Sequence, residues 1–202
     1  MIFVGGATSA RASENLRTML VMIDRDQWSA ARAVAARSDR DTADIYEWLN
    51  LAREDENQDF SRYEQFLMTH TTWPMTRRIR AHAERVMDDT ISPSRIARLY
   101  LDAEPVSARG MIAYVRALDS LNRAPEADRR LNEWFKDAGL IVPEQDDILS
   151  AFRTRITTTA LQARLNNVLV KGDFSNARAL ARRMGDGYNE LVAARIALAD
   201  RA

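Results

Sequence analysis

The sequence has no cysteine among its 202 residues, and its 7 glycines and 5 prolines are few for that length. The absence of cysteine excludes a disulfide framework, a cysteine-bound zinc and a thiol nucleophile. No apolar run approaches the roughly 18 residues of a membrane-spanning helix, so no such helix is expected. The scarcity of helix-breaking residues, together with abundant alanine, favours a helical protein.

An excess of charge of one sign is also lacking. The 29 Lys and Arg residues balance 29 Asp and Glu residues, so the formal net charge is +0 at pH 7. Binding to a phosphate backbone depends on a basic surface. The sequence therefore predicts no nucleic-acid partner, and a helical DNA-binding regulator is disfavoured.

Residues 1–12 differ from the rest of the chain. The segment from Met1 to Gly6 is apolar but too short for the hydrophobic region of a signal peptide, and no basic residue precedes it. It continues into small residues ending in Ala10-Arg11-Ala12, which is similar to a signal-peptide cleavage site. Two interpretations stay open: a remnant of an export signal, or a disordered N-terminus.

Residues 13–202 carry apolar residues at the spacing of amphipathic helices. Examples are Ile45, Trp48, Leu49 and Ala52, then Phe60, Tyr63, Phe66 and Leu67, and near the end Leu191, Ala194 and Leu198. All five prolines lie at the starts of such segments, and Gly139 and Gly172 follow apolar segments as C-terminal caps would. This pattern predicts about eleven or twelve short helices with short connections, which favour antiparallel neighbours.

A weak internal repeat indicates how these helices stack. Residues 28–37 (WSAARAVAAR) and 174–183 (FSNARALARR) share six of ten residues, and each segment follows an apolar helix and a short polar turn. Small residues on the second helix of a pair allow close approach, as in tetratricopeptide-like repeats. We expect a right-handed α-superhelix over residues 13–202, although alanine-rich helices also align by chance.

No residue is assigned to catalysis, a cofactor or a metal. His82 lies near the apolar stripe of its segment and is expected in or beside the core, whereas His70 closes a helix; neither has metal-site spacing. The acidic groups (Glu54-Asp55-Glu56 with Asp59, Asp88-Asp89 and Asp146-Asp147) are expected at solvated helix ends. Gly185 and Gly187 flank Asp186 in a turn that lacks the features of a phosphate loop.

One ordered set of residues spans nearly the whole chain. It comprises Trp28, Ala31 and Arg32; residues 45–51 (IYEWLNL); Phe60, Phe66, Leu67, His70, Trp73 and Pro74; Arg80, Ala83 and Glu84; Ala108, Arg109, Gly110, Ala117 and Leu118; Arg123, Glu126, Ala127, Trp134 and Phe135; and residues 164–198. In this order the set resembles the N-terminal superhelical region of soluble periplasmic lytic transglycosylases, over about residues 14–200.

This resemblance implies an enzyme that cleaves peptidoglycan glycan strands between N-acetylmuramic acid and N-acetylglucosamine, without hydrolysis and without a cofactor. The family's catalytic acid is a Glu followed by Ser in a lysozyme-like C-terminal domain, with a Gly-Leu-Met-Gln segment downstream. Neither motif occurs in this sequence. Glu47 and Glu54, the nearest formal candidates, lie on expected repeat helices and match nothing in the catalytic motif, so no catalytic residue is carried over.

Two functions remain open at this stage. We expect a periplasmic superhelical scaffold of a lytic transglycosylase, present as a fragment or a truncated gene product. It would meet the glycan strand as part of the full enzyme, and it is expected to be inactive alone because the catalytic domain is missing. The alternative is a free-standing tetratricopeptide-like adaptor that binds a protein or peptide.

Overall fold

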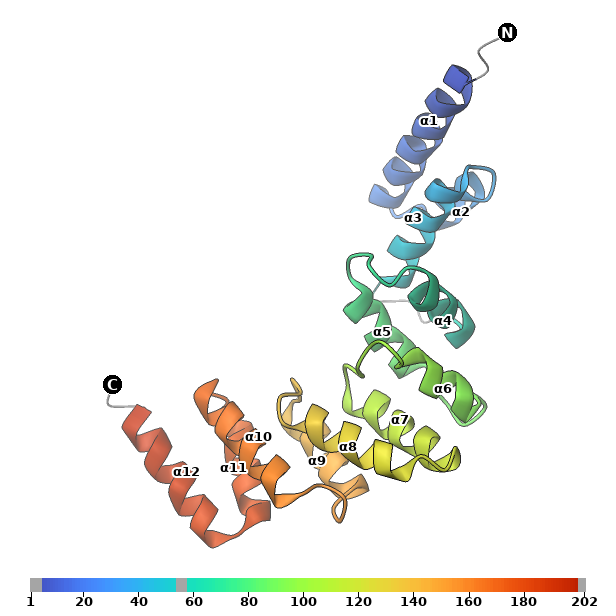
Figure 1. The fold of residues 1–202 in the computed structure, drawn as a ribbon. Helices are drawn as coiled ribbons and strands as arrows, with labels where there is room; N and C mark the ends of the chain where they lie inside the picture. Colours follow the sequence, from blue (N-terminus) through green and yellow to red (C-terminus); the bar gives the residue numbers. More distant parts are fainter. Residues whose placement is uncertain (1–4, 54–57, 200–202) are drawn as a thin grey trace. The chain divides into compact units, whose positions relative to one another are not determined.

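The computed structural model describes the backbone of residues 5–53 and 58–199, with side chains from residue 12 onward in those ranges. These residues form twelve α-helices and no β-strand (Figure 1). The predicted all-α class and the predicted number of helices are therefore confirmed. Among the described helices, none combines the length and the apolar composition needed to cross a bilayer.

The chain divides into two compact units, Met1–His82 and Ala83–Ala202, with the boundary inside one helix. The helices up to that boundary are α1 (Gly5–Asp24), α2 (Trp28–Ala35), α3 (Arg40–Leu51), α4 (Phe60–Thr69) and α5 (Thr76–Arg85). Those that follow are α6 (Pro93–Leu99), α7 (Ala108–Ser120), α8 (Ala124–Phe135), α9 (Val142–Ala151), α10 (Thr158–Val170), α11 (Phe174–Met184) and α12 (Asp186–Ala199).

The helices that pack on each other are neighbours in the sequence or lie two positions apart, and most pairs of the second kind belong to the second unit. In the first unit α1 packs on α2 and α3, and α3 packs on α4. In the second unit α6 packs on α7, α7 on α8, and α10 on α11 as neighbours in the sequence. The pairs two positions apart are α7 with α9, α8 with α10, α9 with α11, and α10 with α12. This alternation is typical of stacked helix pairs.

Three helix pairs are joined by the same turn. Residues Asp26, Asn122 and Gly172 have φ angles of 59°, 59° and 72°. After each, the next backbone N–H donates to a carbonyl five residues earlier at 2.8 Å: Gln27 to Met22, Arg123 to Leu118, and Asp173 to Val168. This is the hydrogen bond of a Schellman motif, which closes a helix with a left-handed residue. The internal similarity seen in the sequence therefore corresponds to a shared turn geometry.

Helix starts follow the signals in the sequence. Pro93, Pro125 and Pro143 lie in the first turns of α6, α8 and α9, as predicted. Ser107 and Thr157 cap α7 and α10 by accepting a hydrogen bond from the backbone N–H three residues later. Helix α1 begins at Gly5 and includes residues 5–12 of the distinctive N-terminal segment, while residues 1–4 of that segment lie outside the described part.

The predicted apolar stripes supply much of the core of both units, but two of them differ from the structure. On α3 the predicted Ile45, Trp48 and Leu49 are only half-buried, whereas Tyr46 and Leu51 are buried. Phe60, Tyr63, Phe66 and Leu67 are all buried, as the periodicity indicated. On α12 the predicted stripe is wrong, because Val192 and Ile196 are buried whereas Leu191 and Leu198 are 46% and 65% exposed and Ala194 is exposed. Apolar residues occur around this whole helix, so spacing alone does not select the face that packs.

Candidate functional site

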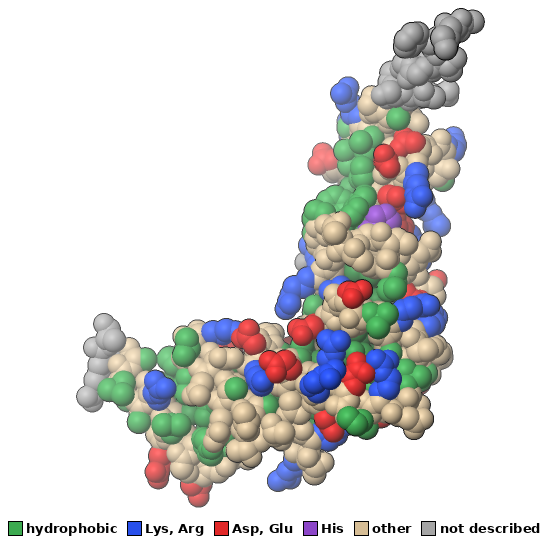
Figure 2. Space-filling view, in the orientation of Figure 1, with side chains coloured by type: hydrophobic (Ala, Val, Ile, Leu, Met, Phe, Trp, Pro, Cys, Tyr) green, Lys and Arg blue, Asp and Glu red, His purple; other side chains and the backbone are tan. Residues whose placement is uncertain are grey.

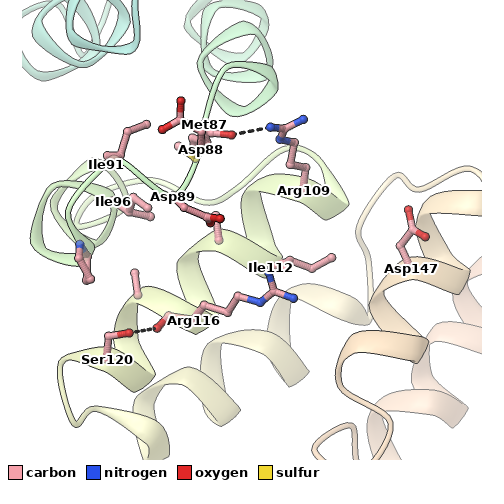
Figure 3. Close-up of a pocket in the computed structure, with 13 residues that line it drawn as sticks. Met87, Asp88, Asp89, Ile91, Ile96, Arg109, Ile112, Arg116, Ser120 and Asp147 are labelled. Carbon is pink, nitrogen blue, oxygen red and sulfur yellow. Dashed lines mark hydrogen bonds between the residues drawn. The ribbon is translucent and has the colours of Figure 1, made fainter.

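The candidate site is a groove of about 680 Å³ in the second unit (Figure 3). It lies between the segment after α5, the helices α6 and α7, and Asp147 of α9. Ile91, Ile96 and Ile112 supply aliphatic surface inside it. Its volume is in the range of roughly 300–1,000 Å³ that is common for ligand clefts.

The sequence of α7 places one face of that helix on the groove. Counted from Arg109, the residues Ile112, Ala113, Arg116 and Ser120 lie at i+3, i+4, i+7 and i+11, so all five share a face of the helix. The opposite face is apolar and buried, through Met111, Tyr114, Val115 and Leu118. Burial of that second face therefore turns the two arginines toward the groove.

Charged groups of both signs surround the groove. Arg116, Asp89 and Asp147 are exposed, and none of the three has an ion pair or a side-chain hydrogen bond with the described residues. The guanidinium of Arg109 instead donates to the carbonyl of Met87, which fixes α7 against the preceding segment. Figure 2 shows the same mixture more widely: acidic and basic side chains are interspersed on the face in view.

The segment after α5 is stabilised by its own side chains. Asp88 accepts hydrogen bonds from the backbone N–H and the hydroxyl of Thr90, at 2.9 and 2.5 Å. The pKa of Asp88 is lowered from its usual value, chiefly by the Thr90 hydroxyl, with a smaller effect of Arg109. Asp88 is therefore an anionic member of the groove over a wide pH range.

Glu84, at the end of α5, is a fully buried carboxylate beneath this region. It accepts hydrogen bonds from the backbone N–H groups of Val106 and Ser107 at 2.9 and 2.8 Å, from the Ser107 hydroxyl, and from the Tyr100 hydroxyl at 3.0 Å. The pKa of Glu84 is raised above its ordinary value. Burial is the largest cause and outweighs the hydrogen bonds, which act in the opposite direction. The carboxylate thereby connects α5, the end of α6 and the start of α7, which together form most of the groove.

A second buried charge lies farther along the same unit. Arg164 of α10 is 1% exposed and donates to the Gln145 side chain at 2.6 Å and to the carbonyls of Phe135 and Ala138 at 3.0 and 2.9 Å. Its guanidinium also lies 4.8 Å from the centre of the Phe135 ring. Burial lowers the pKa of Arg164 to about 10. These contacts connect α8, α9 and α10.

The histidines lie where the sequence indicated, and neither belongs to the groove. His82 is buried, with Nδ1 2.9 Å from the Leu51 carbonyl. His70 ends α4, stacks on Phe66 at 4.5 Å between ring centres, and has Nε2 3.3 Å from an Asp44 carboxylate oxygen. Both contacts are structural in kind, and no group of three or more potential metal ligands occurs among the described residues.

The carboxylates considered earlier have different positions. Glu47 forms an ion pair with Arg62 in the first unit, with Nε–Oε1 at 3.0 Å. Glu54 and its acidic neighbours up to residue 56 lie outside the described residues. Asp88-Asp89 and Asp147, expected only as solvated helix ends, lie at the groove.

Sequence reasoning did not find the groove or its arginines. The one available signal was the spacing of Arg109 and Arg116 on a single helix face, opposite a buried apolar face. What the groove offers is fixed charge of both signs beside aliphatic surface, which suits the binding of an ionic ligand. Comparisons with protein-family models, with curated proteins and with solved structures find no match to the chain.

Proposed function

We propose that this chain is the superhelical scaffold region of a peptidoglycan lytic transglycosylase and acts in the periplasm. The observation that carries the proposal is the packing of the second unit, in which each helix from α7 to α10 contacts the helix two positions along, besides close pairs such as α7 with α8 and α10 with α11. Such stacking produces a long, rigid surface that can hold a polymer along its length. The ordered residues from Trp28 to residue 198 supply the resemblance to this particular enzyme family.

In this proposal the scaffold holds substrate and a separate catalytic part breaks the bond. That part uses one Glu as acid and then as base, and it leaves a 1,6-anhydro end on the glycan. No residue of this chain takes part in the chemical step. The net charge of +0 suits the role, because it avoids long-range repulsion from a wall polymer that carries both carboxylates and amines.

The right-handed superhelix belongs to the same proposal. It is supported by the shared turn at Asp26, Asn122 and Gly172, because helix pairs that are closed by the same turn have a similar internal geometry and can stack as repeats. Small-angle X-ray scattering of the purified chain tests it. A curved, elongated particle is expected, and a spherical particle would contradict it.

A sedimentation assay with purified sacculi tests the function. The chain is expected to pellet with sacculi, more than a neutral helical protein of similar size does, and to release no 1,6-anhydro product. A chain that stays in the supernatant contradicts the scaffold proposal and favours the tetratricopeptide-like adaptor. Release of 1,6-anhydro ends would show instead that residues of this chain are catalytic.

A further inference from the structure

We propose that the groove between α6, α7 and Asp147 binds the peptide stems of peptidoglycan and not its sugar chain. This inference rests on the proposed function and assigns a ligand to the groove described above. The ligand class is a short extended peptide that carries carboxylates, an ammonium group and small aliphatic side chains. Three features of the groove support it: its side-chain composition, its unpaired charges and the spacing of its arginines.

The groove has no aromatic side chain among the 13 residues that line it (Figure 3). Sugar rings in proteins are commonly held by stacking on aromatic faces, combined with neutral hydrogen-bonding groups. This groove instead presents the aliphatic groups of Ile91, Ile96 and Ile112 next to charged groups. Methyl and methylene groups of a peptide fit such a surface better than a hydroxyl-covered ring does.

The unpaired charges are complementary to a peptide with both kinds of ionic group. Arg116 has no ionic partner among the described residues and offers a planar guanidinium that matches a carboxylate. Asp89 and Asp147 are likewise unpaired and suit an ammonium group. Asp147 comes from α9 and Arg116 from α7, so the two signs approach the ligand from different elements (Figure 3).

The arginine spacing fits an extended chain. Arg109 and Arg116 are seven residues apart on one helix, which corresponds to about 10 Å along the helix axis. An extended peptide covers that length in about three residues. A peptide of about three residues therefore reaches from Arg116 to the Arg109 end of the groove, where the Arg109 guanidinium has N–H groups beyond the one that donates to Met87.

The walls of the groove are held in place before any ligand binds. Glu84 connects α5 to the start of α7, and Arg109 donates to the Met87 carbonyl on the opposite wall. A preformed groove loses less conformational entropy on binding. Ligand recognition then depends on the exposed Arg116, Asp89 and Asp147, which can be replaced without disturbing a buried contact.

The test uses one enzymatic digestion to separate the two candidate ligands. An amidase that removes the peptides from sacculi yields free peptide stems and peptide-free glycan strands. Each is titrated into the ¹⁵N-labelled full chain, in the wild type and in the variants Arg116→Glu and Arg129→Glu. Arg129 is an exposed arginine on α8 outside the groove and is the matched control.

The stems are expected to shift the amide signals of α7 and of the segment after α5, and to bind about tenfold more weakly to Arg116→Glu but not to Arg129→Glu. Binding should weaken with added salt. The proposal is overturned if the glycan strands shift these signals and the stems do not, or if the two variants bind stems equally. An unrelated peptide with the same charges that binds as tightly as the stems overturns the assignment to the cell wall.

These outcomes are distinct from failure of the scaffold proposal. If the chain does not pellet with sacculi at all, the proposed function fails, and the groove has no cell-wall ligand. If the chain pellets with intact sacculi and the released glycan strands compete with this pelleting while the free stems do not, the scaffold proposal stands and the peptide assignment is wrong. Competition by the free stems and not by the glycan strands supports both.

Discussion

Gly110 of α7 lies directly against the carboxylate of Glu84, so closely that a Cβ atom at position 110 would be 2.2 Å from the carboxyl carbon. The same atom would lie 2.5 Å from each carboxylate oxygen. Helix α7 can therefore approach the buried end of α5 only because residue 110 has no side chain. This fit, together with the hydrogen bonds of Glu84 to the residues before α7, determines where one wall of the groove stands.

Replacing Gly110 by Ala should therefore destabilise the second unit. We expect a loss of about 2–4 kcal/mol, from overpacking and from disturbed hydrogen bonds of a buried carboxylate. Urea unfolding measures it. Gly139→Ala is the control, because no atom lies within 4 Å of the added Cβ and its φ is not positive, so its effect should stay within about 1 kcal/mol. Equal effects of the two substitutions would contradict the close fit.

The contribution of Glu84 to stability should fall as pH rises, which is the opposite of what is expected for a carboxylate whose pKa is lowered by folding. The pKa of Glu84 is raised above the ordinary value of 4.5, so between 4.5 and the raised pKa the folded chain binds more protons than the unfolded chain. The contribution of Glu84 to the free energy of unfolding therefore falls as pH rises through that window, and it levels off above the folded pKa. The unfolding free energy of the wild type minus that of Glu84→Gln measures this contribution at each pH. A value that increases with pH would contradict the prediction.

Arg164→Ala should cost about 3–5 kcal/mol of stability, because it leaves the buried Gln145 oxygen and the carbonyls of Phe135 and Ala138 without their donor. Chemical unfolding of the purified variant tests this value. Arg183→Ala is the comparison, since Arg183 forms an exposed ion pair with Asp146 and should contribute less than about 1 kcal/mol. A small effect of Arg164→Ala would show that water replaces the lost donors.

Substitutions at Asn122 test the turn that joins three of the helix pairs. Its φ of 59° is tolerated by Asn and is better suited to Gly. We expect Asn122→Val to lower stability by about 1–2 kcal/mol, because a β-branched side chain is strained in that conformation. Asn122→Gly should leave the melting temperature unchanged or slightly higher, and a loss as large as that of the valine variant would show that side-chain contacts determine the effect.

The sequence predicted the helices well because each helix depends on residues close together in the chain. Periodicity located the buried face of α4, and prolines marked the starts of α6, α8 and α9. It failed on α12, where apolar residues surround the helix and Val192 and Ile196 are selected by packing on α10 and α11.

The groove and its supports could not be predicted in the same way. Glu84 belongs to a helix rich in charged residues and resembles a surface glutamate until the chain returns 22 residues later at Val106. Arg164 similarly finds its acceptors 19 to 29 residues earlier, at Gln145 and Phe135. Contacts over such distances depend on how helices stack, which local spacing does not specify.

The turns that contain a residue of positive φ also influence how the chain folds. Asp26, Asn122 and Gly172, with φ angles of 59°, 59° and 72°, close three separate helix pairs along the chain. The turns at Asp26, Asn122 and Gly172 each close contacts between helices that are only a few residues apart in the chain, so little loop entropy is lost. Folding can therefore begin independently at each of these turns and spread outward, and damage to one pair need not prevent the others from forming.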